Sequence, residues 1–486
     1  MMRKLTVLAV VAALSLGLSA CDDDDDNNNP SPSPSPSPSP SPPPTSSVCD
    51  ETFIECNGTQ ATIVGTVDKD LTLDPDFEWF LGDEFVFIGG GAVEIADEAQ
   101  AQAIRDAGVT LTVPAGTEVR ASGPDSALIV TRGSKIIAEG TPTEPITFWA
   151  GETNINEYGQ WGGVVLQGFG EYYDEGGAPV CHGGTQSYCN VAGEGGAGFF
   201  GGNDNADDSG VLRYVRIANG GLVAGPNSEV NGLTLQGVGY NTEIEYVQVH
   251  RNQDDGVEWF GGAVNAKHLV LTGNDDDDID FDTGWKGNVQ YALAIKAPTR
   301  FSSGNDPRGI EANSSDEAYQ PETTGALANI SLIGDDASNT PSAEPGMRLR
   351  GALTVSIYNS AVSGYDDECI RIDDADTDGQ GTIVQSIVTL VNVIGTGCAE
   401  FFGHETPESQ SGGGAVPFTY DGAFAIVEPA ANVGATTIEA VDNGSGFTFD
   451  QTDYIGAVEP GTAAAEAWWA GWTLPGTVSL PLAEVQ

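Results

Sequence analysis

Two short stretches rich in aspartate carry the residues best suited to chemistry in this chain. They are "NQDDGVEWFGG" (Asn252–Gly262) and "NDDDDIDFDTG" (Asn274–Gly284), and they align without a gap at an offset of 22 residues. Carboxylates gathered this closely can bind a hard divalent cation or act as a general acid and base. In both stretches apolar and acidic residues alternate, which indicates strands with one buried face.

The offset predicts a ladder of carboxylates on neighbouring coils of the chain. Equivalent residues of successive coils lie about 4.8 Å apart. The three expected pairs are Asp254 with Asp276, Asp255 with Asp277, and Glu258 with Asp280. Like charges at that spacing repel each other, so protons or cations must intervene.

Calcium is the simplest neutralising partner at neutral pH, because it takes six to eight oxygen ligands and tolerates irregular turns. The predicted ligands are Asp254, Asp255, Glu258, Asp276, Asp277, Asp278 and Asp280. A second acidic loop, "GGNDNADDSG", supplies Asp204, Asp207 and Asp208 for another ion. The alternative interpretation is that all of these are solvated turn carboxylates.

A third acidic copy, "YDDECIRIDD" (Tyr365–Asp374), supplies candidates for catalysis. Together with "NDDDDIDF" it is similar to the aspartate-bearing coils of the polygalacturonase family, whose inverting hydrolysis needs an acid and a base carboxylate. The resemblance implies catalytic roles for Asp276, Asp366, Asp367 and Arg371. It is incomplete, because 90 residues separate Asp276 from Asp366 and the family's histidine and arginine motifs appear only as "GHE" and "RID". A lyase would instead need an arginine or lysine base beside bound calcium.

Short strands must position these residues. Segments such as "SGVLRYVRIANGG", "TEIEYVQVHRN" and "VNAKHLVLTGN" alternate apolar and polar residues and close on glycine or asparagine, which tolerate turns. Repeats of this length built of strands predict a solenoid. We therefore predict an all-β fold, a right-handed parallel β-helix with coils of about 22 residues. One helix is expected over Glu94–Gly108, and the tryptophans of "WWAGWT" are expected to plug the C-terminal end of the solenoid.

Longer phrases resemble a family of mostly uncharacterised, secreted or lipid-anchored β-helix proteins of Gram-negative bacteria. They include "ALIVTRGSKIIAEGTPTEPITF", "QWGGVVLQGFG" and "DDGVEWFGGAVNAKHLVLTGNDDDDIDFDTGW", and they extend over about residues 60–475. The resemblance implies the fold and an envelope location. It implies no catalytic residue, because the family carries no agreed activity.

The N-terminal segment "MMRKLTVLAVVAALSLGLSAC" resembles a bacterial lipoprotein signal peptide. Cleavage would leave Cys21 as the lipid-bearing residue, followed by an acidic and Pro/Ser-rich stalk with no means of forming a core. We expect a lipid-anchored protein at the outer membrane or cell surface rather than on the periplasmic face of the inner membrane. The predicted parts are a signal peptide (1–20), a stalk (21–47), an N-terminal cap with the first coils (48–110), the β-helix (111–475) and a tail (476–486).

The remaining six cysteines form three close pairs in the sequence, which indicates an oxidising compartment. Fifteen pairings are open in principle, but the spacing favours local bridges. The favoured pairs are Cys49 with Cys56, Cys181 with Cys189, and Cys369 with Cys398.

The balance of acidic and basic residues limits the kinds of molecule that this protein can bind. The chain has 18 basic and 71 acidic residues and a formal net charge of −53, which excludes nucleic-acid binding. We expect a calcium-stabilised surface protein for binding or adhesion, with a polysaccharide or another envelope protein as partner. The alternative is a polysaccharide hydrolase or lyase.

Overall fold

The computed structural model describes residues 47–151, 155–173, 181–221, 223–225, 228–297, 307–314, 319–334, 344–373, 386–405, 418–421 and 437–478. The chain divides into two units, residues 1–43 and 44–486, and every element named below belongs to the second. Cys21 and the predicted stalk therefore lie outside the described residues, apart from Ser47. Within the described part of the chain, no helix is long and apolar enough to cross a membrane.

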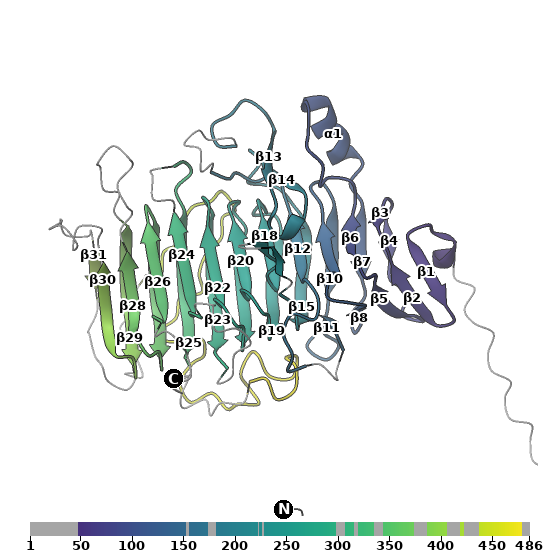
Figure 1. The fold of residues 1–486 in the computed structure, drawn as a ribbon. Coiled ribbons are helices and arrows are strands. Elements are labelled where there is room, and N and C mark those ends of the chain that lie inside the picture. Colours follow the sequence, from purple (N-terminus) through teal and green to yellow (C-terminus); the bar gives the residue numbers. More distant parts are fainter. Residues whose placement is uncertain are drawn as a thin grey trace, which may run out of the picture. The chain divides into compact units, whose positions relative to one another are not determined.

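Two long sheets of mainly parallel strands form this unit (Figure 1). The main path of sheet A is β1 (Ile54–Asn57), β2 (Gln60–Ile63), β5 (Glu78–Leu81), β8 (Glu118–Ala121), β11 (Ile146–Trp149), β15 (Gly210–Ala218), β19 (Glu243–His250), β21 (Ala266–Thr272), β23 (Lys286–Ile295), β25 (Thr324–Ile333), β27 (Thr354–Ser363), β29 (Ile387–Thr396) and β31 (Phe418–Asp421). Beside this path lie β4 (Leu71–Thr72), β7 (Thr110–Val113) and β10 (Lys135–Glu139).

Between successive strands of sheet A, the chain forms a strand of sheet B. Its order is β3 (Thr66–Val67), β6 (Phe85–Ile88), β9 (Ala127–Val130), β12 (Val164–Gln167), β18 (Leu233–Gln236), β20 (Val257–Phe260), β22 (Ile279–Asp282), β24 (Ile310–Ser314), β26 (Met347–Gly351), β28 (Glu368–Asp373) and β30 (Glu400–Glu405). Alternation between two parallel sheets is the arrangement of a β-helix, so the predicted fold class is confirmed.

The predicted 22-residue offset holds at the centre of the stack. Val257 pairs with Ile279 across β20 and β22, and Ile244 pairs with Ala266 across β19 and β21. The next step in sheet B is longer, because Ile279 pairs with Ile310. Insertions therefore lengthen the connections between strands while the register of the strands is kept.

The core between the sheets is built from the inward positions of the alternating pattern. Val257, Trp259, Ile279 and Phe281, which the alternation assigns to the core, are all fully buried. Burial of apolar surface at about 25 cal/mol per Å² is the main source of stability in such a stack. The acidic residues between them consequently face outward.

The predicted helix is present with narrower bounds, as α1 (Glu98–Asp106). The Asp97 side chain caps it by accepting a hydrogen bond from the Gln100 backbone N–H at 2.9 Å. It lies beside the β13 (Tyr188–Ala192) and β14 (Phe199–Gly202) hairpin (Figure 1), where Glu98 accepts bonds from the Ser187 N–H and hydroxyl. The helix thus braces an insertion. Short elements complete the unit: η1 (Ser47–Asp50), η3 (Glu194–Gly196), β16 (Val223–Gly225) and β17 (Ser228–Glu229).

The C-terminal tryptophans do not plug the end of the solenoid, so that prediction is wrong. Residues 437–478, here called the C-terminal strap, run back along the outer face of sheet A (Figure 1). Trp472 contacts Tyr214 of β15 and Tyr246 of β19, in the middle of the stack, with ring centroids 5.8 and 6.0 Å apart. The reason is that sheet A has apolar outward residues, such as Val270 and Leu293, that require cover.

The three disulfides favoured by the cysteine spacing are present. They join Cys49 to Cys56, Cys181 to Cys189, and Cys369 to Cys398. The last links the start of β28 to the segment just before β30, the next strand of sheet B.

Candidate functional site

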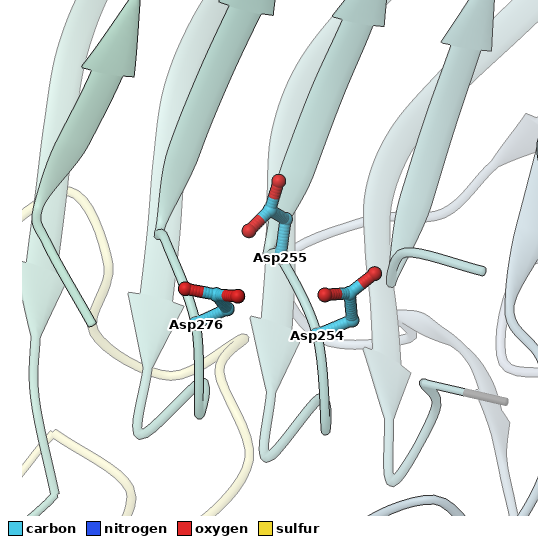
Figure 2. Close-up of side chains that lie close together, drawn as sticks. All are labelled: Asp254, Asp255 and Asp276. Carbon is cyan, nitrogen blue, oxygen red and sulfur yellow. The ribbon is translucent and has the colours of Figure 1, made fainter. Parts of the chain in front are cut away.

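The aspartate ladder forms as the sequence predicts. Glu258 of β20 lies opposite Asp280 of β22, and the bends before these strands carry the remaining aspartates. Figure 2 shows Asp254 and Asp255 on one bend and Asp276 on the next, with their carboxylates close together. The backbone N–H of Asp277 donates a 2.9 Å hydrogen bond to Asp255 Oδ1, which links the two bends directly.

Three groups of carboxylates have oxygen atoms within 4.8 Å of one another and could hold a metal ion. They are Asp254 with Asp255 and Asp276, Asp255 with Glu258 and Asp280, and Asp277 with Asp280 and Glu311. Glu311 lies on β24 opposite Asp280, and the sequence did not single it out because the connection before β24 is longer than 22 residues. Three adjacent coils therefore contribute to one acidic site.

Burial and mutual repulsion both disfavour the charged forms of these carboxyls. Burial, and next the Asp254 charge, raise the pKa of Asp255 well above its usual range. Desolvation and then the charge of Glu311 likewise raise the pKa of Asp280, although this residue keeps some exposure. A bound cation or proton would relieve this repulsion.

Glu258 has mainly acidic groups around it. Burial raises its pKa well above its usual range, and the charges that act on it most strongly are Glu194, Asp280 and Asp255. Its side chain is held by Asn231, whose Nδ2 donates to Glu258 Oε2 and, at 3.3 Å, to Glu194 Oε2. Glu194 comes from the η3 turn of the insertion, so the sequence had no register from which to place it here.

The opposite side of the site is neutralised by protein cations. Arg308, only 2% exposed, lies 3.5 Å from Asp277, 2.5 Å from Glu311 and 3.0 Å from Glu344. Burial raises the pKa of Asp277 and the arginine lowers it. Two adjacent parts of the site therefore differ in their need for an added cation.

Asp278 is a correction to the predicted calcium ligands. Its Oδ2 lies 3.0 Å from Lys296 Nζ, and both side chains are fully buried. Asp278 belongs to none of the carboxylate groups found among the described residues. A carboxylate already paired with a buried lysine gains little from a metal ion, so we remove it from the ligand set.

The second predicted calcium loop is not gathered into one site. Asp204 lies 3.6 Å from Arg105, and Asp208 forms an ion pair with Lys135. Asp207 is buried, which raises its pKa to about 7, and Ser209 Oγ donates to it at 3.2 Å. The three carboxylates face separate partners, so the prediction of a shared ion at this loop is not supported.

The proposed hydrolytic pair is also not brought together. The strand register runs from Ile279 through Ile310 and Met347 to Ile370, which places Asp366 and Asp367 three coils beyond Asp276. Three steps correspond to about 14 Å. Inverting hydrolysis requires carboxyl groups about 6.5–9.5 Å apart, so Asp276 and Asp366 or Asp367 do not form such a pair. Arg371 instead lies 3.2 Å from Asp367 and 3.3 Å from Glu368.

The tertiary structure reveals a feature that the sequence does not show. One row of outward-facing side chains across sheet B is acidic at one end and basic at the other. This charged row consists of Glu258, Asp280, Glu311, Arg348 and Arg371, paired in register on five consecutive strands of sheet B. The next outward row adds Arg350, 2.9 Å from Glu311, and Asp373, 2.7 Å from Arg348. The acidic end of this row thus continues directly into a basic end, whose arginines form ion pairs with Asp373, Asp367 and Glu368.

The fold and this row together define the class of the protein, a parallel β-helix with a charged site on the outer face of one sheet. Residues 94–473 match the family described as the pectate-lyase-like beta helix domain, and the chain belongs to this family. A comparison with curated proteins finds no match.

Solved structures with a similar fold share little sequence with this chain. The catalytic domain of a GH87 α-1,3-glucanase in complex with tetrasaccharides is 11% identical, with 74% of this chain and 68% of that one covered and a TM-score of 0.25. The periplasmic alginate epimerase AlgG is 9% identical, with 76% and 79% covered and a TM-score of 0.23. A mannuronan C-5 epimerase A-module from Azotobacter vinelandii is 10% identical, with 69% and 95% covered and a TM-score of 0.24. These likenesses concern the fold alone.

Proposed function

We propose that this protein is a lipid-anchored surface protein that binds anionic glycan through calcium on the outer face of sheet B. The observation that carries the proposal is the charged row, in which the buried carboxylates of Glu258 and Asp280 continue through Glu311 to the partly exposed Arg348 and Arg371. The lipid anchor rests on the resemblance of residues 1–21 to a lipoprotein signal peptide, with Cys21 as the modified residue.

The calcium site is assigned to the group formed by Asp255, Glu258 and Asp280. Their oxygens lie within 4.8 Å of one another, which suits ligands that share one ion. Calcium prefers carboxylate oxygens and fills its remaining positions with water or ligand atoms. The neighbouring group with Asp277 and Glu311 needs the ion less, because Arg308 already lies between these carboxylates.

The anionic part of the ligand is argued from Arg348 and Arg371. Their side chains are 27% and 21% exposed, and they lie on adjacent strands of the charged row. A glycan with repeated carboxylates can place one acidic group on the bound calcium and another on these guanidinium groups. Without the ion, the net negative charge of the protein should repel such a ligand.

Binding of polygalacturonate and alginate to the full-length protein tests this proposal. Isothermal titration should detect calcium binding and calcium-dependent glycan binding, both abolished by Glu258→Gln. The control variant Glu94→Gln removes an exposed carboxylate that belongs to none of the three carboxylate groups of the described residues, and it should bind as the wild type does. Glycan binding that is equal in calcium and in chelator would contradict the proposal.

A second candidate function is a polysaccharide lyase or hydrolase, and one observation favours it. Arg348 and Arg371 continue the row that bears Glu311 and Asp280, so basic groups begin two strands beyond Asp280, a ligand of the proposed ion. Incubation with the same glycans and measurement of unsaturated uronate and reducing ends separates the two functions. Turnover that is lost in Arg348→Met would identify an enzyme, and the binding function would then describe only its substrate complex.

A further inference from the structure

The C-terminal strap is held on sheet A without forming a strand of it, and one backbone hydrogen bond joins the two, from the Gly456 N–H to the Asn359 carbonyl at 2.8 Å. As described by the structure, residues 437–478 contain no helix or strand, and none of the strand pairings found in the described chain involves them. The strap nevertheless contacts strands from β15 to β29 (Figure 1), where it is drawn in yellow. It therefore lies on the β-helix as a separate layer.

Side-chain amides of sheet A bind the backbone of the strap in pairs. Asn288 of β23 accepts from the Val441 N–H at 2.7 Å and donates to the Val441 carbonyl at 3.1 Å. Gln290 does the same for Asp450, at 3.0 and 2.9 Å. Each amide thus imitates the peptide group of a neighbouring strand and satisfies both backbone groups of one strap residue.

Two more amides extend this recognition along the sheet. Gln248 of β19 accepts from the Leu474 N–H at 2.7 Å, and Asn359 of β27 donates to the Thr452 carbonyl at 3.1 Å. All four amide side chains belong to residues that are fully buried beneath the strap. Buried amides of this kind are costly unless they are paired, so this face is built for an extended peptide.

Aromatic rings provide the apolar part of the contact. Tyr246 and His268 are stacked with ring centroids 4.2 Å apart. Trp468 meets His268 edge-on at 5.1 Å, and Trp472 meets Tyr246 at 6.0 Å. Beneath them Val270 and Leu293, which face outward from sheet A, are completely buried.

Charge does not explain why the strap docks. Its ionisable side chains that are charged at neutral pH are all acidic, and residues 437–478 contain no lysine, arginine or histidine. Asp450 forms an ion pair with Lys267 at 3.2 Å, but the protein as a whole carries a net charge of −53. Neutral hydrogen bonds and ring burial, with single contacts from Lys267 to Phe447 and from Arg216 to the Trp472 carbonyl, therefore hold the strap against general repulsion.

We infer that the outer face of sheet A is a peptide-binding groove, that the strap is its resident ligand, and that the groove accepts the strap of a second copy of this chain. Removal of the strap breaks no ladder, but it exposes amides and apolar residues that must be covered again. An identical segment from another copy satisfies every one of these contacts, which is the basis of domain swapping. This inference does not depend on the glycan or calcium proposal.

The experiment separates the strap from the rest of the chain and measures whether an added strap peptide can replace it. A protease site is inserted between Asp421 and Thr437, the purified protein is cut, and a fluorescent synthetic peptide of residues 437–478 is added. We expect the cut strap to remain bound during gel filtration and to be replaced by the labelled peptide in excess. Added sodium chloride should strengthen binding of the peptide, because it screens like charges.

Matched variants test which contacts determine binding of the strap peptide. A labelled peptide with Trp472→Ala should fail to replace the strap, and Gln290→Leu in the protein should weaken peptide binding about tenfold, since two hydrogen bonds are lost. The control Gln102→Leu, on α1, should bind the peptide as the wild type does. Absence of exchange under conditions where the cut protein stays folded would overturn the inference, as would aggregation of the cut protein when the strap is released.

Discussion

At the scale of single residues, the site is a place where folding opposes ionisation. Asp255 and Glu258 are 7% and 8% exposed, and each is surrounded mainly by other carboxylates. Such groups persist in proteins when something outside the cluster compensates them. Removal of one charge and addition of a cation should therefore have related effects on stability.

The first prediction concerns Glu258→Gln. We expect the variant to be more stable than the wild type in chelator, because a buried charge and its repulsion with Asp280 are removed. Calcium at a hundredfold excess over its Kd should stabilise the wild type by about 2.7 kcal/mol and the variant much less. Thermal melts in chelator, in calcium and in sodium of matched ionic strength measure this, with Glu94→Gln as control. Coincident calcium and sodium curves for the wild type would show that the site binds no ion.

The second prediction concerns pH. The pKa values of Asp255, Glu258, Asp277 and Asp280 are raised in the folded state, so these groups bind protons more tightly there than in the unfolded chain. Their contribution is present below the unfolded pKa of about 4 and is lost as pH rises through the folded pKa. In chelator, stability should therefore increase as pH is lowered from neutrality towards about 4.

Calcium should reverse this dependence, because it binds the ionised carboxylates. Urea unfolding at a series of pH values in chelator and in calcium measures both slopes. If stability measured in chelator instead rises with pH between about 4 and 7, the pKa values of these carboxyls are not raised by folding and the prediction is wrong.

The third prediction concerns Arg308→Met. This arginine is the shared partner of Asp277, Glu311 and Glu344, and it is 2% exposed. Its loss should leave buried carboxylates unpaired and cost about 3–5 kcal/mol of unfolding free energy. The control Arg120→Met removes an arginine that is 40% exposed and paired with Glu118, and it should change stability by less than about 1 kcal/mol. Added calcium should partly restore the Arg308 variant.

At the scale of elements, sheet A repeats one unusual backbone conformation at the same position of successive strands. Seven residues at equivalent positions of consecutive strands have positive φ angles: Tyr214, Tyr246, His268, Tyr291, Asn329, Asn359 and Asn392. This left-handed conformation costs about 1–2 kcal/mol for a residue other than glycine. Stacking of the rings with one another, and hydrogen bonds from the asparagines to the strap, offset that cost.

The fourth prediction separates these two contributions at Asn329, which has φ 56° and donates to the Gly456 carbonyl at 3.1 Å. Asn329→Gly should lose the side-chain hydrogen bonds, but glycine adopts a positive φ without strain. Asn329→Ala should lose the same hydrogen bonds and should also be strained at this φ. The alanine variant should therefore be less stable than the glycine variant by about 1 kcal/mol. Chemical denaturation of both variants gives the difference, and equal stabilities would mean that the backbone conformation is not strained.

At the scale of the whole molecule, the charge of −53 and the N-terminal segment set the expected location. A protein this acidic should not adhere to anionic lipid by itself, so attachment to a membrane requires the proposed lipid on Cys21. The fifth prediction is that Cys21→Ser shifts the protein from the membrane fraction to the soluble fraction and abolishes incorporation of labelled palmitate. An unchanged membrane fraction in that variant would show a different attachment.

The amino-acid sequence by itself determined the solenoid, its core alternation and the pairing of Glu258 with Asp280, because each depends on short-range periodicity, and it determined the disulfides because paired cysteines lie close together in the chain. Only the tertiary structure decided the rest. Glu194, Glu311 and Arg308 reach the acidic site across insertions of irregular length, so no fixed offset links them to it. The strap is placed by contacts between residues far apart in the sequence, such as Gln290 with Asp450, 160 positions apart, and such contacts leave no periodic trace in the sequence.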